Sequence, residues 1–253
     1  MRLDEFYNDD EFIRAEDELV YRSAFNRISV NKEASRHLRE GFGRRIFMMQ
    51  CSRIFLREHT NREGNDPPDP YLVEELNVHM NSYYINLRGC LDNLAWALNY
   101  QFSIVSANED APNRKDCDLF GGRFLRSLEQ LQPSLRDCLR PYENWASDLK
   151  HLRDPAAHRV PMSVIGGFLT PERVAEFDTL WSKASLHDRE RNGYSRSHFV
   201  RQAYRLLEYA PLLAVSTVSG LETREISVQV GNDHRQFLTL AGLVVDAFSN
   251  AAS

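Results

Sequence analysis

Apolar residues recur along most of the chain at intervals of three and four, which is the spacing of one face of an α-helix. The clearest example is a single stripe over residues 76–98. Glycines interrupt a second long helix, predicted over residues 32–59, at Gly41 and Gly43, where we expect a bend or close packing. The same spacing predicts further helices over residues 123–131, 171–191, 197–209 and 234–250, with two more that begin at Pro133 and Pro141. The predicted fold class is therefore mainly α, a helical bundle.

Two short segments depart from the helical pattern. Residues 160–169 and 224–230 are rich in β-branched residues, and the second segment alternates Ile226, Val228 and Val230 as a strand does. We expect the two segments to pair as a small two-stranded β accessory to the helices.

The chain is expected to form one domain, because no linker rich in glycine, serine or proline divides residues 1–253. Its hydrophobic fraction of 42% and charged fraction of 26% are those of an ordinary globular protein with a core. Residues 1–18 carry eight acidic residues against two arginines, which is typical of a solvated helix face or a frayed end. Residues 166–253 are expected to add accessory helices, the strand segment 224–230 and a C-terminal helix.

Charge and cysteine content exclude several classes of protein. A net charge of −5 argues against nonspecific coating of nucleic acid, although a local basic site remains compatible with it. The four cysteines are scattered and form no Cys-x-x-Cys pair, which indicates reduced thiols. The chain has neither a secretory signal nor a long apolar run. We therefore expect a cytoplasmic protein with no membrane partner.

No common cofactor or metal motif is present: the chain lacks dinucleotide-binding and phosphate-binding glycine loops, a Gly-x-Ser-x-Gly elbow and a His-Glu-x-x-His pair. We expect no cofactor. A metal site is weighed because His151, Asp154 and His158 would share one face of an uninterrupted helix. Pro155 opposes that continuity, and no Glu-x-x-His occurs elsewhere to complete a carboxylate-rich bundle site, so we expect no metal.

The segment with the most chemical potential lies just beyond a helix predicted to end near Leu152. It places Arg153, Asp154 and His158 within six residues. An arginine can neutralise a phosphate in a transition state, and a histidine can take or give a proton near neutral pH. RNA supplies its own nucleophile, the 2′-hydroxyl. Asp154 is expected to cap a new helix that begins at Pro155 and to orient either neighbour.

Arg153, the polar Asp154 and His158 resemble the Arg-x4–6-His motif of HEPN-fold proteins, in which a polar residue commonly follows the arginine. Upstream, residues 87–96 resemble a helix that uncharacterised bacterial proteins pair with a similar Arg-Asp-Pro-x-x-His-Arg run. The resemblance covers residues 70–165, the HEPN-like core. It implies a helical bundle, often dimeric, whose active members are metal-independent endoribonucleases with Arg and His from two subunits in one cleft. Other members have lost catalysis and act as binding modules.

Two functional hypotheses follow. In the first, His158 is the acid and base, Arg153 binds the scissile phosphate and Asp154 orients them in an endoribonuclease, a toxin or defence effector restrained by a cognate inhibitor protein. In the second, the chain is a non-catalytic dimeric interaction module, and the motif offsets the dipole and caps carbonyls at a helix end. The intact motif favours the first hypothesis, and the negative net charge favours the second.

The bare motif is not specific. Only four of the 31 basic residues are lysine, so arginine is common and about two or three matches are expected by chance. Residues 53–59 and 191–198 also match. Surface charge along a long helix explains the first of these, and Gly193 predicts a loop in the second.

Arg88 and Asp92 are candidate supporting residues in the upstream helix. Because they lie four residues apart, the simplest prediction is an intrahelical ion pair worth a few tenths of a kcal/mol. The alternative is that Asp92 holds Arg153 from the facing helix. Trp96 and Trp145 are expected to be core or dimer-interface aromatics.

Overall fold

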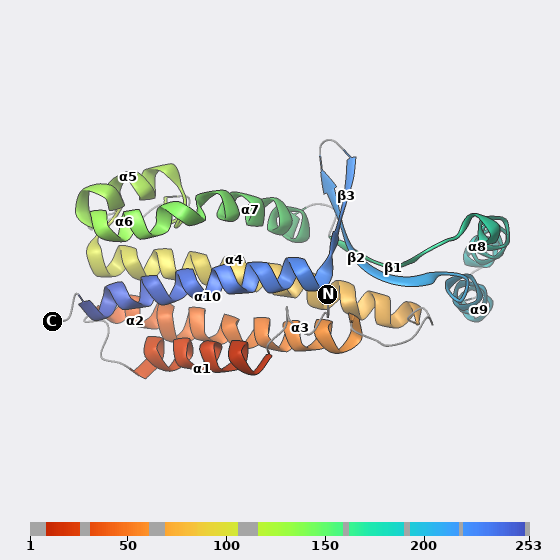
Figure 1. The fold of residues 1–253 in the computed structure, drawn as a ribbon, viewed down its shortest axis with the longest axis horizontal. Helices are drawn as coiled ribbons and strands as arrows, with labels where there is room; N and C mark the ends of the chain where they lie inside the picture. Colours follow the sequence, from red (N-terminus) through yellow and green to blue (C-terminus); the bar gives the residue numbers. More distant parts are fainter. Residues whose placement is uncertain are drawn as a thin grey trace.

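The computed structural model is a bundle of long helices from which an arm extends at one end (Figure 1). The predicted mainly α fold class is confirmed. Among the described residues, no helix combines the length and the apolar composition that a membrane span requires. The structure describes residues 9–25, 31–60, 69–105, 116–158, 162–189, 193–217 and 220–250.

The bundle is built around α4 (Pro70–Phe102), which packs against α3, α7 and α10. Its predicted apolar stripe is confirmed, since Leu76, Met80, Tyr83, Leu87, Leu91, Leu94 and Leu98 are all fully buried. The helices around it are α1 (Asp9–Phe25), α3 (Arg44–Thr60), α7 (Glu143–His158) and α10 (Ile226–Asn250), with the shorter α5 (Gly122–Leu131), α6 (Pro133–Leu139) and 3-10 helix η3 (Arg140–Tyr142) beside them.

The long helix predicted over residues 32–59 is present with an irregular middle. It consists of α2 (Lys32–Arg36), the π-helix η2 (His37–Gly43) and α3. Gly41 allows close packing there, because a Cβ at this position would collide with the side chain of Asn93 on α4. A π-helix is therefore found where the two glycines predicted a bend or a close approach.

The arm is made of residues 163–217. Its strands β1 (Ser163–Phe168) and β2 (Glu208–Thr217) form an antiparallel ribbon that leaves the bundle (Figure 1). The ribbon carries two helices at its far end, α8 (Val174–Arg189) and α9 (Gly193–Tyr204), which we call the hairpin. A short 3-10 helix, η4 (Pro171–Arg173), precedes α8, and β3 (Gly220–Glu225) completes the sheet in the order β1-β2-β3.

The predicted small β accessory is present, and β1 lies within the predicted segment 160–169, but the second strand and the pairing were predicted wrongly. β1 pairs with β2, which the sequence pattern did not predict, and Ile226 and Val230 belong to α10 instead of a strand. Both residues are fully buried and lie four apart, in line with Phe237 further along α10. A spacing of four satisfies strand alternation and helix periodicity equally, so the ambiguity is resolved only by the longer stripe. α10 is part of the bundle core, packed on α1, α3 and α4.

The root of the arm is attached to α4 through two asparagines. Asn77 Oδ1 accepts a hydrogen bond from the amide of Val164 at 2.5 Å, and Asn81 Nδ2 donates to the carbonyl of Met162 at 3.0 Å. These bonds satisfy polar groups at the outer edge of β1, which would otherwise be an open strand edge. The arm therefore leaves the bundle from a fixed position.

Two helix-interior glycines provide a test of this packing. A Cβ at Gly242 in α10 would meet no atom within 4 Å, whereas a Cβ at Gly89 in α4 would lie 2.5 Å from the guanidinium of Arg45. We expect Gly242→Ala to raise the free energy of unfolding by about 0.5–1 kcal/mol, because alanine restricts the unfolded chain.

Gly89→Ala gains the same helix propensity but displaces Arg45, whose Nη1 donates to Asn86 Oδ1 at 3.0 Å. Its free energy of unfolding should therefore fall below that of Gly242→Ala. Urea denaturation of both variants measures the difference, and equal stabilisation by the two substitutions would contradict the packing of Arg45 on Gly89.

Candidate functional site

The segment 153–158 lies inside a helix. α7 runs from Glu143 to His158 without a break, so Pro155 is an interior residue and Asp154 does not cap a new helix. The prediction of a helix junction was wrong. Proline removes one backbone hydrogen bond, but the rest of α7 packs along α4 and holds the helical path. The side chains of Arg153, Asp154 and His158 lie outside the described residues, so their contacts stay a prediction.

The continuity of α7 orders the backbone positions around its axis. At 3.6 residues per turn, positions 154 and 158 lie about 40° apart, whereas positions 153 and 158 lie about 140° apart. Asp154 and His158 therefore occupy one face of α7, and Arg153 occupies a different one.

The same continuity removes the objection that Pro155 raised against a metal site on His151, Asp154 and His158. Among the residues whose side chains the structure describes, no group of three or more His, Cys, Asp or Glu is placed to hold a metal ion. Asp154 and His158 are not among those residues, so the expectation of no metal on this face stays a prediction.

Arg88 and Asp92 form the predicted intrahelical ion pair, with 3.4 Å between Arg88 Nε and Asp92 Oδ1. A residue that the sequence pattern did not indicate binds the same guanidinium more closely: Asp118, in the segment before α5, accepts from Arg88 Nη2 at 2.5 Å. The side chain of Arg88 is only 9% exposed. Arg88 therefore attaches the segment before α5 to α4, which is a structural role.

Of the other two matches to the motif, residues 53–59 lie within α3, and the described part of the second, residues 193–198, lies within α9. Arg53 is fully buried, so the interpretation of residues 53–59 as surface charge was wrong. His59 packs on the ring of Phe55, with 4.3 Å between ring centroids. In the other match, Arg191 lies outside the described residues, and α9 begins at Gly193 where a loop was predicted. His198 is exposed on that helix.

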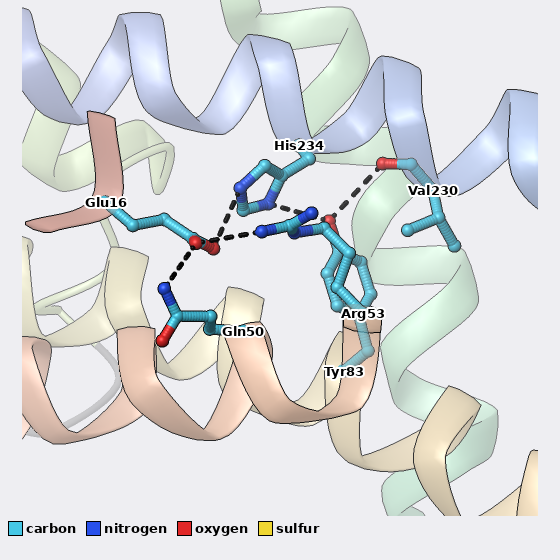
Figure 2. A network of polar contacts seen from close by, with 6 residues as sticks. All are labelled: Glu16, Gln50, Arg53, Tyr83, Val230 and His234. Atoms are coloured by element: carbon cyan, nitrogen blue, oxygen red, sulfur yellow. Dashed lines mark hydrogen bonds and ion pairs between the residues drawn. The ribbon is translucent and has the colours of Figure 1, made fainter. Parts of the chain in front are cut away.

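The most concentrated set of buried ionisable groups lies in the centre of the bundle (Figure 2). The carboxylate of Glu16 on α1 accepts from Arg53 Nη2 at 2.9 Å and from Gln50 Nε2 at 3.0 Å, both on α3. Its other oxygen lies 3.0 Å from Nε2 of His234 on α10. Glu16, Arg53 and His234 are all fully buried. One carboxylate therefore joins three helices.

The network continues to α4 through Tyr83. Its hydroxyl lies 3.2 Å from Nδ1 of His234 and donates to the carbonyl of Val230 at 3.4 Å (Figure 2). The two ring nitrogens of His234 thus contact a carboxylate on one side and a phenol on the other. This arrangement fixes the orientation of the imidazole.

The environment of Glu16 favours its charged form. Burial alone would raise the pKa of Glu16, but contact with His234 and the positive charge of Arg53 lower it from its ordinary value of 4.5. A buried carboxylate is tolerated only when it is paired and hydrogen-bonded in this way. Glu16 is therefore an ionised anchor in the bundle core.

A second buried carboxylate lies next to the first network. Asp233 accepts from the hydroxyl of Tyr84 at 2.8 Å, from Trp145 Nε1 at 2.9 Å and from Gln229 Nε2 at 2.8 Å. Burial raises the pKa of Asp233, and these hydrogen bonds oppose the rise. Because Trp145 belongs to α7, Asp233 attaches the helix that carries the motif to α4 and α10.

Neither network is open to a substrate. Glu16, Arg53 and His234 have no exposed surface, and Asp233 is 4% exposed. These residues therefore have a structural role: they fix the positions of α1, α3, α4, α7 and α10 relative to one another.

The two tryptophans that the sequence predicted to lie in the core or at a dimer interface differ in burial. Trp145 is 7% exposed and lies in the core. Trp96 is half-buried and stacks on His37 and Tyr100, each with 5.7 Å between ring centroids.

Sequence patterns missed Glu16, Asp233 and His234, although a signal was present. Glu16 lies four residues after Phe12 and three before Leu19, both of which are buried. It therefore lies on the apolar face of α1, in a segment that its overall charge had assigned to solvent. Asp233 and His234 likewise fall between Val230 and Phe237 on the buried face of α10. An ionisable residue at a position on the apolar face of a predicted helix therefore indicates a buried ionisable group, and this pattern could have identified all three residues.

Acid titration tests the anchor role of Glu16. We expect Glu16→Gln to lower the free energy of unfolding near neutral pH by about 3–5 kcal/mol, because it leaves Arg53 buried without its counterion. The folded pKa of Glu16 lies below 4.5. The stability that its ionised form contributes is therefore present above that pH and is lost as the pH falls through the folded pKa.

The difference between wild type and Glu16→Gln should consequently shrink on acidification, as measured by urea denaturation over a pH series. Asp233, whose pKa is raised, contributes a dependence of the opposite sign, but it is present in both proteins and cancels. Glu18→Gln is the matched control, because the side chain of Glu18 is 68% exposed. A difference that stays constant with pH would exclude an ionised Glu16.

Comparisons with protein-family models, with curated proteins and with solved structures gave no match to this chain. The function must therefore be inferred from the chain's own residues.

Proposed function

We propose that the chain is a HEPN-like, metal-independent endoribonuclease. The observation that carries the proposal is the grouping of Arg153, Asp154 and His158 on the last turns of a helix that is packed into a bundle. The mainly α fold is the class that the resemblance to HEPN proteins implies. His158 is assigned as the acid and base, Arg153 as the ligand of the scissile phosphate and Asp154 as the residue that orients them.

The chemistry requires no group beyond these side chains and the RNA. His158 takes the proton from a 2′-hydroxyl, and the 2′-oxygen forms a bond to the adjacent phosphorus as the bond from phosphorus to the 5′-oxygen breaks. The products are a 2′,3′-cyclic phosphate and a 5′-hydroxyl, and His158, acting now as the acid, returns the proton that it took to the leaving 5′-oxygen. Arg153 offsets the negative charge that develops on the phosphate oxygens.

The helical geometry favours a site shared by two chains. Positions 153 and 158 lie about 140° apart around α7, so one phosphate cannot lie directly over both positions of a single helix. An arginine from one chain and a histidine from another can face the same phosphate without this restriction. The proposal therefore includes a homodimer with RNA as its substrate. In its finer form it describes a cytoplasmic toxin or defence effector that a cognate inhibitor protein restrains.

Cleavage of mixed RNA in the presence of EDTA tests the proposal. Wild type is expected to cut, and Arg153→Ala and His158→Ala are each expected to lose at least about 100-fold in rate, the usual contribution of such a group. Lys150→Ala and His151→Ala are matched controls, since both residues are exposed on the same helix, and they should retain activity. No cleavage by wild type, or equal cleavage by all five proteins, would remove the proposal.

A mixing experiment tests the shared site. When Arg153→Ala and His158→Ala chains exchange at equal amounts, half of the dimers are mixed and each mixed dimer has one intact shared site. Activity should then return to about a quarter of the wild-type value for a two-fold dimer. If each chain carries its own complete site, the mixture stays inactive.

A non-catalytic interaction module is the second candidate function. One observation favours it: the hairpin at the end of the arm exposes large apolar side chains, of which Trp181 is 44% exposed. Surfaces of this kind mark contacts with other macromolecules.

A further inference from the structure

The buried carboxylate of Asp233 is surrounded by uncharged partners. Its hydrogen-bond donors are the hydroxyl of Tyr84, the indole of Trp145 and the amide of Gln229. An ionised carboxylate in the core is costly unless a positive charge compensates it. The compensating charge for Asp233 must therefore lie beyond its direct neighbours.

Arg224 supplies a positive charge to this carboxylate through one intervening side chain. Arg224 lies on β3, and its Nη1 donates to Gln229 Oε1 at 3.2 Å. The same amide donates from Nε2 to Asp233 Oδ2 at 2.8 Å. Because the amide accepts from a guanidinium and donates to a carboxylate, both bonds require one orientation of Gln229. We call Arg224, Gln229 and Asp233 the relay.

The relay favours the ionised form of Asp233. Burial raises the pKa of Asp233, the hydrogen bonds from Gln229, Tyr84 and Trp145 oppose the rise, and the charge of Arg224 opposes it further. Arg224 is the charged group that acts on this carboxylate. Loss of Arg224 therefore makes protonation of Asp233 easier.

The other ionisable groups on elements packed around α10 have partners of their own. Glu16 on α1 and Arg53 on α3 pair with each other beside His234. On α6, Arg136 pairs with Glu143 of α7 at 2.7 Å. These pairs leave the relay as the path by which a positive charge reaches the carboxylate.

The donors around Asp233 suit a charged carboxylate better than a protonated one. The indole of Trp145 can only donate a hydrogen bond, and so can the end of Gln229 that faces the carboxylate. A hydrogen bond to an ionised acceptor is about twice as strong as one between neutral groups. Protonation of Asp233 therefore weakens its bond to Trp145, which is the bond that reaches α7.

We propose that Arg224 is a positioning residue for α7. Through Gln229 it keeps Asp233 ionised, and the ionised carboxylate holds the indole of Trp145 and with it the helix that carries the candidate site. The effect on RNA cleavage rests on the function proposed above, whereas the effect on the indole does not. Because Arg224 pairs in register with Leu213 of β2, the relay also connects α7 to the sheet at the root of the arm.

Glu222 on β3 opposes the relay. Its Oε1 lies 3.0 Å from Nη2 and 3.1 Å from Nε of Arg224, so it offsets part of the arginine's charge. The side chain of Glu222 is 49% exposed and that of Arg224 is 29% exposed. The two residues can therefore be substituted with little disturbance of the core, and their removal should act in opposite directions.

The indole Nε1–H of Trp145 reports the state of Asp233 directly. Its resonance in a proton–nitrogen correlation spectrum of the full chain is identified by its absence in Trp145→Phe. On acidification the resonance should shift as Asp233 takes up a proton, and this step should be absent in Asp233→Asn. The midpoint of the step in wild type is the reference for the other variants.

Arg224→Met should move the midpoint to higher pH, because it removes the charge and keeps most of the length of the side chain. Arg224→Lys keeps the charge and should move the midpoint less. Glu222→Gln should move it to lower pH, since it removes the acid closest to Arg224. Arg235→Met is the matched control, because Arg235 is exposed on α10 two residues after Asp233 and its loss changes the net charge equally. Its midpoint should stay near that of wild type.

Opposite shifts in Arg224→Met and Glu222→Gln would support the relay. A midpoint that Arg224→Met leaves unchanged, or that Arg235→Met moves as far, would overturn it. Circular dichroism should show these variants folded, since none of the three substituted side chains is fully buried.

The pH dependence of RNA cleavage tests the positioning role. Near neutral pH, Arg224→Met is expected to lose about 10-fold to 100-fold in kcat, the order of loss that a misplaced catalytic group causes. Because Asp233 in this variant regains its charge as the pH rises, the ratio of wild-type to variant rates should fall toward one. A purely structural defect predicts a ratio that is constant with pH, and that result would exclude the positioning role.

The two measurements separate this inference from the proposed function. If wild type cuts no RNA, the proposed function fails together with the effect on cleavage, and the titration of Trp145 still decides whether Arg224 controls Asp233. If wild type cuts RNA and Arg224→Met shifts the midpoint but cuts at the wild-type rate near neutral pH, the proposed function stands and the positioning role is wrong.

Discussion

The burial of one carboxylate is the constraint on which the bundle depends. Glu16 has no exposed surface, so its charge must be matched inside the protein by Arg53 and His234. Those partners come from α3 and α10, and α1 supplies the carboxylate. An arrangement that separated any of these helices would leave an ion in an apolar medium. The charges add little net stability compared with apolar packing, but they penalise alternative packings of the same helices, which is a means of specifying one structure.

The seam between α4 and α10 extends this constraint to the candidate site. Two adjacent residues of α4, Tyr83 and Tyr84, contact two adjacent residues of α10, His234 and Asp233. The first pair belongs to the Glu16 network, and the second reaches Trp145 on α7. The position of the helix that carries the motif is thereby tied to the centre of the bundle. If the chain is a nuclease, the buried residues of these two networks position its catalytic helix without contacting RNA themselves.

The sequence predicted the helices well and their boundaries less well, for reasons visible in particular residues. The apolar stripe of α4 is so long that only the helical period fits it and a strand is excluded, and all its residues are buried. Ile226 and Val230 fit two periods, and only packing against the bundle decides between them. Pro155 was predicted to end one helix and begin another, but α7 continues through it because its packing along α4 outweighs the local effect of the proline. The buried charges were missed because composition averages over a helix, whereas burial depends on which face each residue occupies.

The π-helix at His37–Gly43 has a consequence for how this chain tolerates change in length. An additional residue in an α-helix rotates every following side chain by about 100°, which would turn Met49 and Arg53 away from the core. A π segment absorbs one residue within a single wide turn, so the faces before and after it stay aligned. The segment therefore has the form of an accommodated insertion. Deleting one residue within it should leave an ordinary helix with the same buried face.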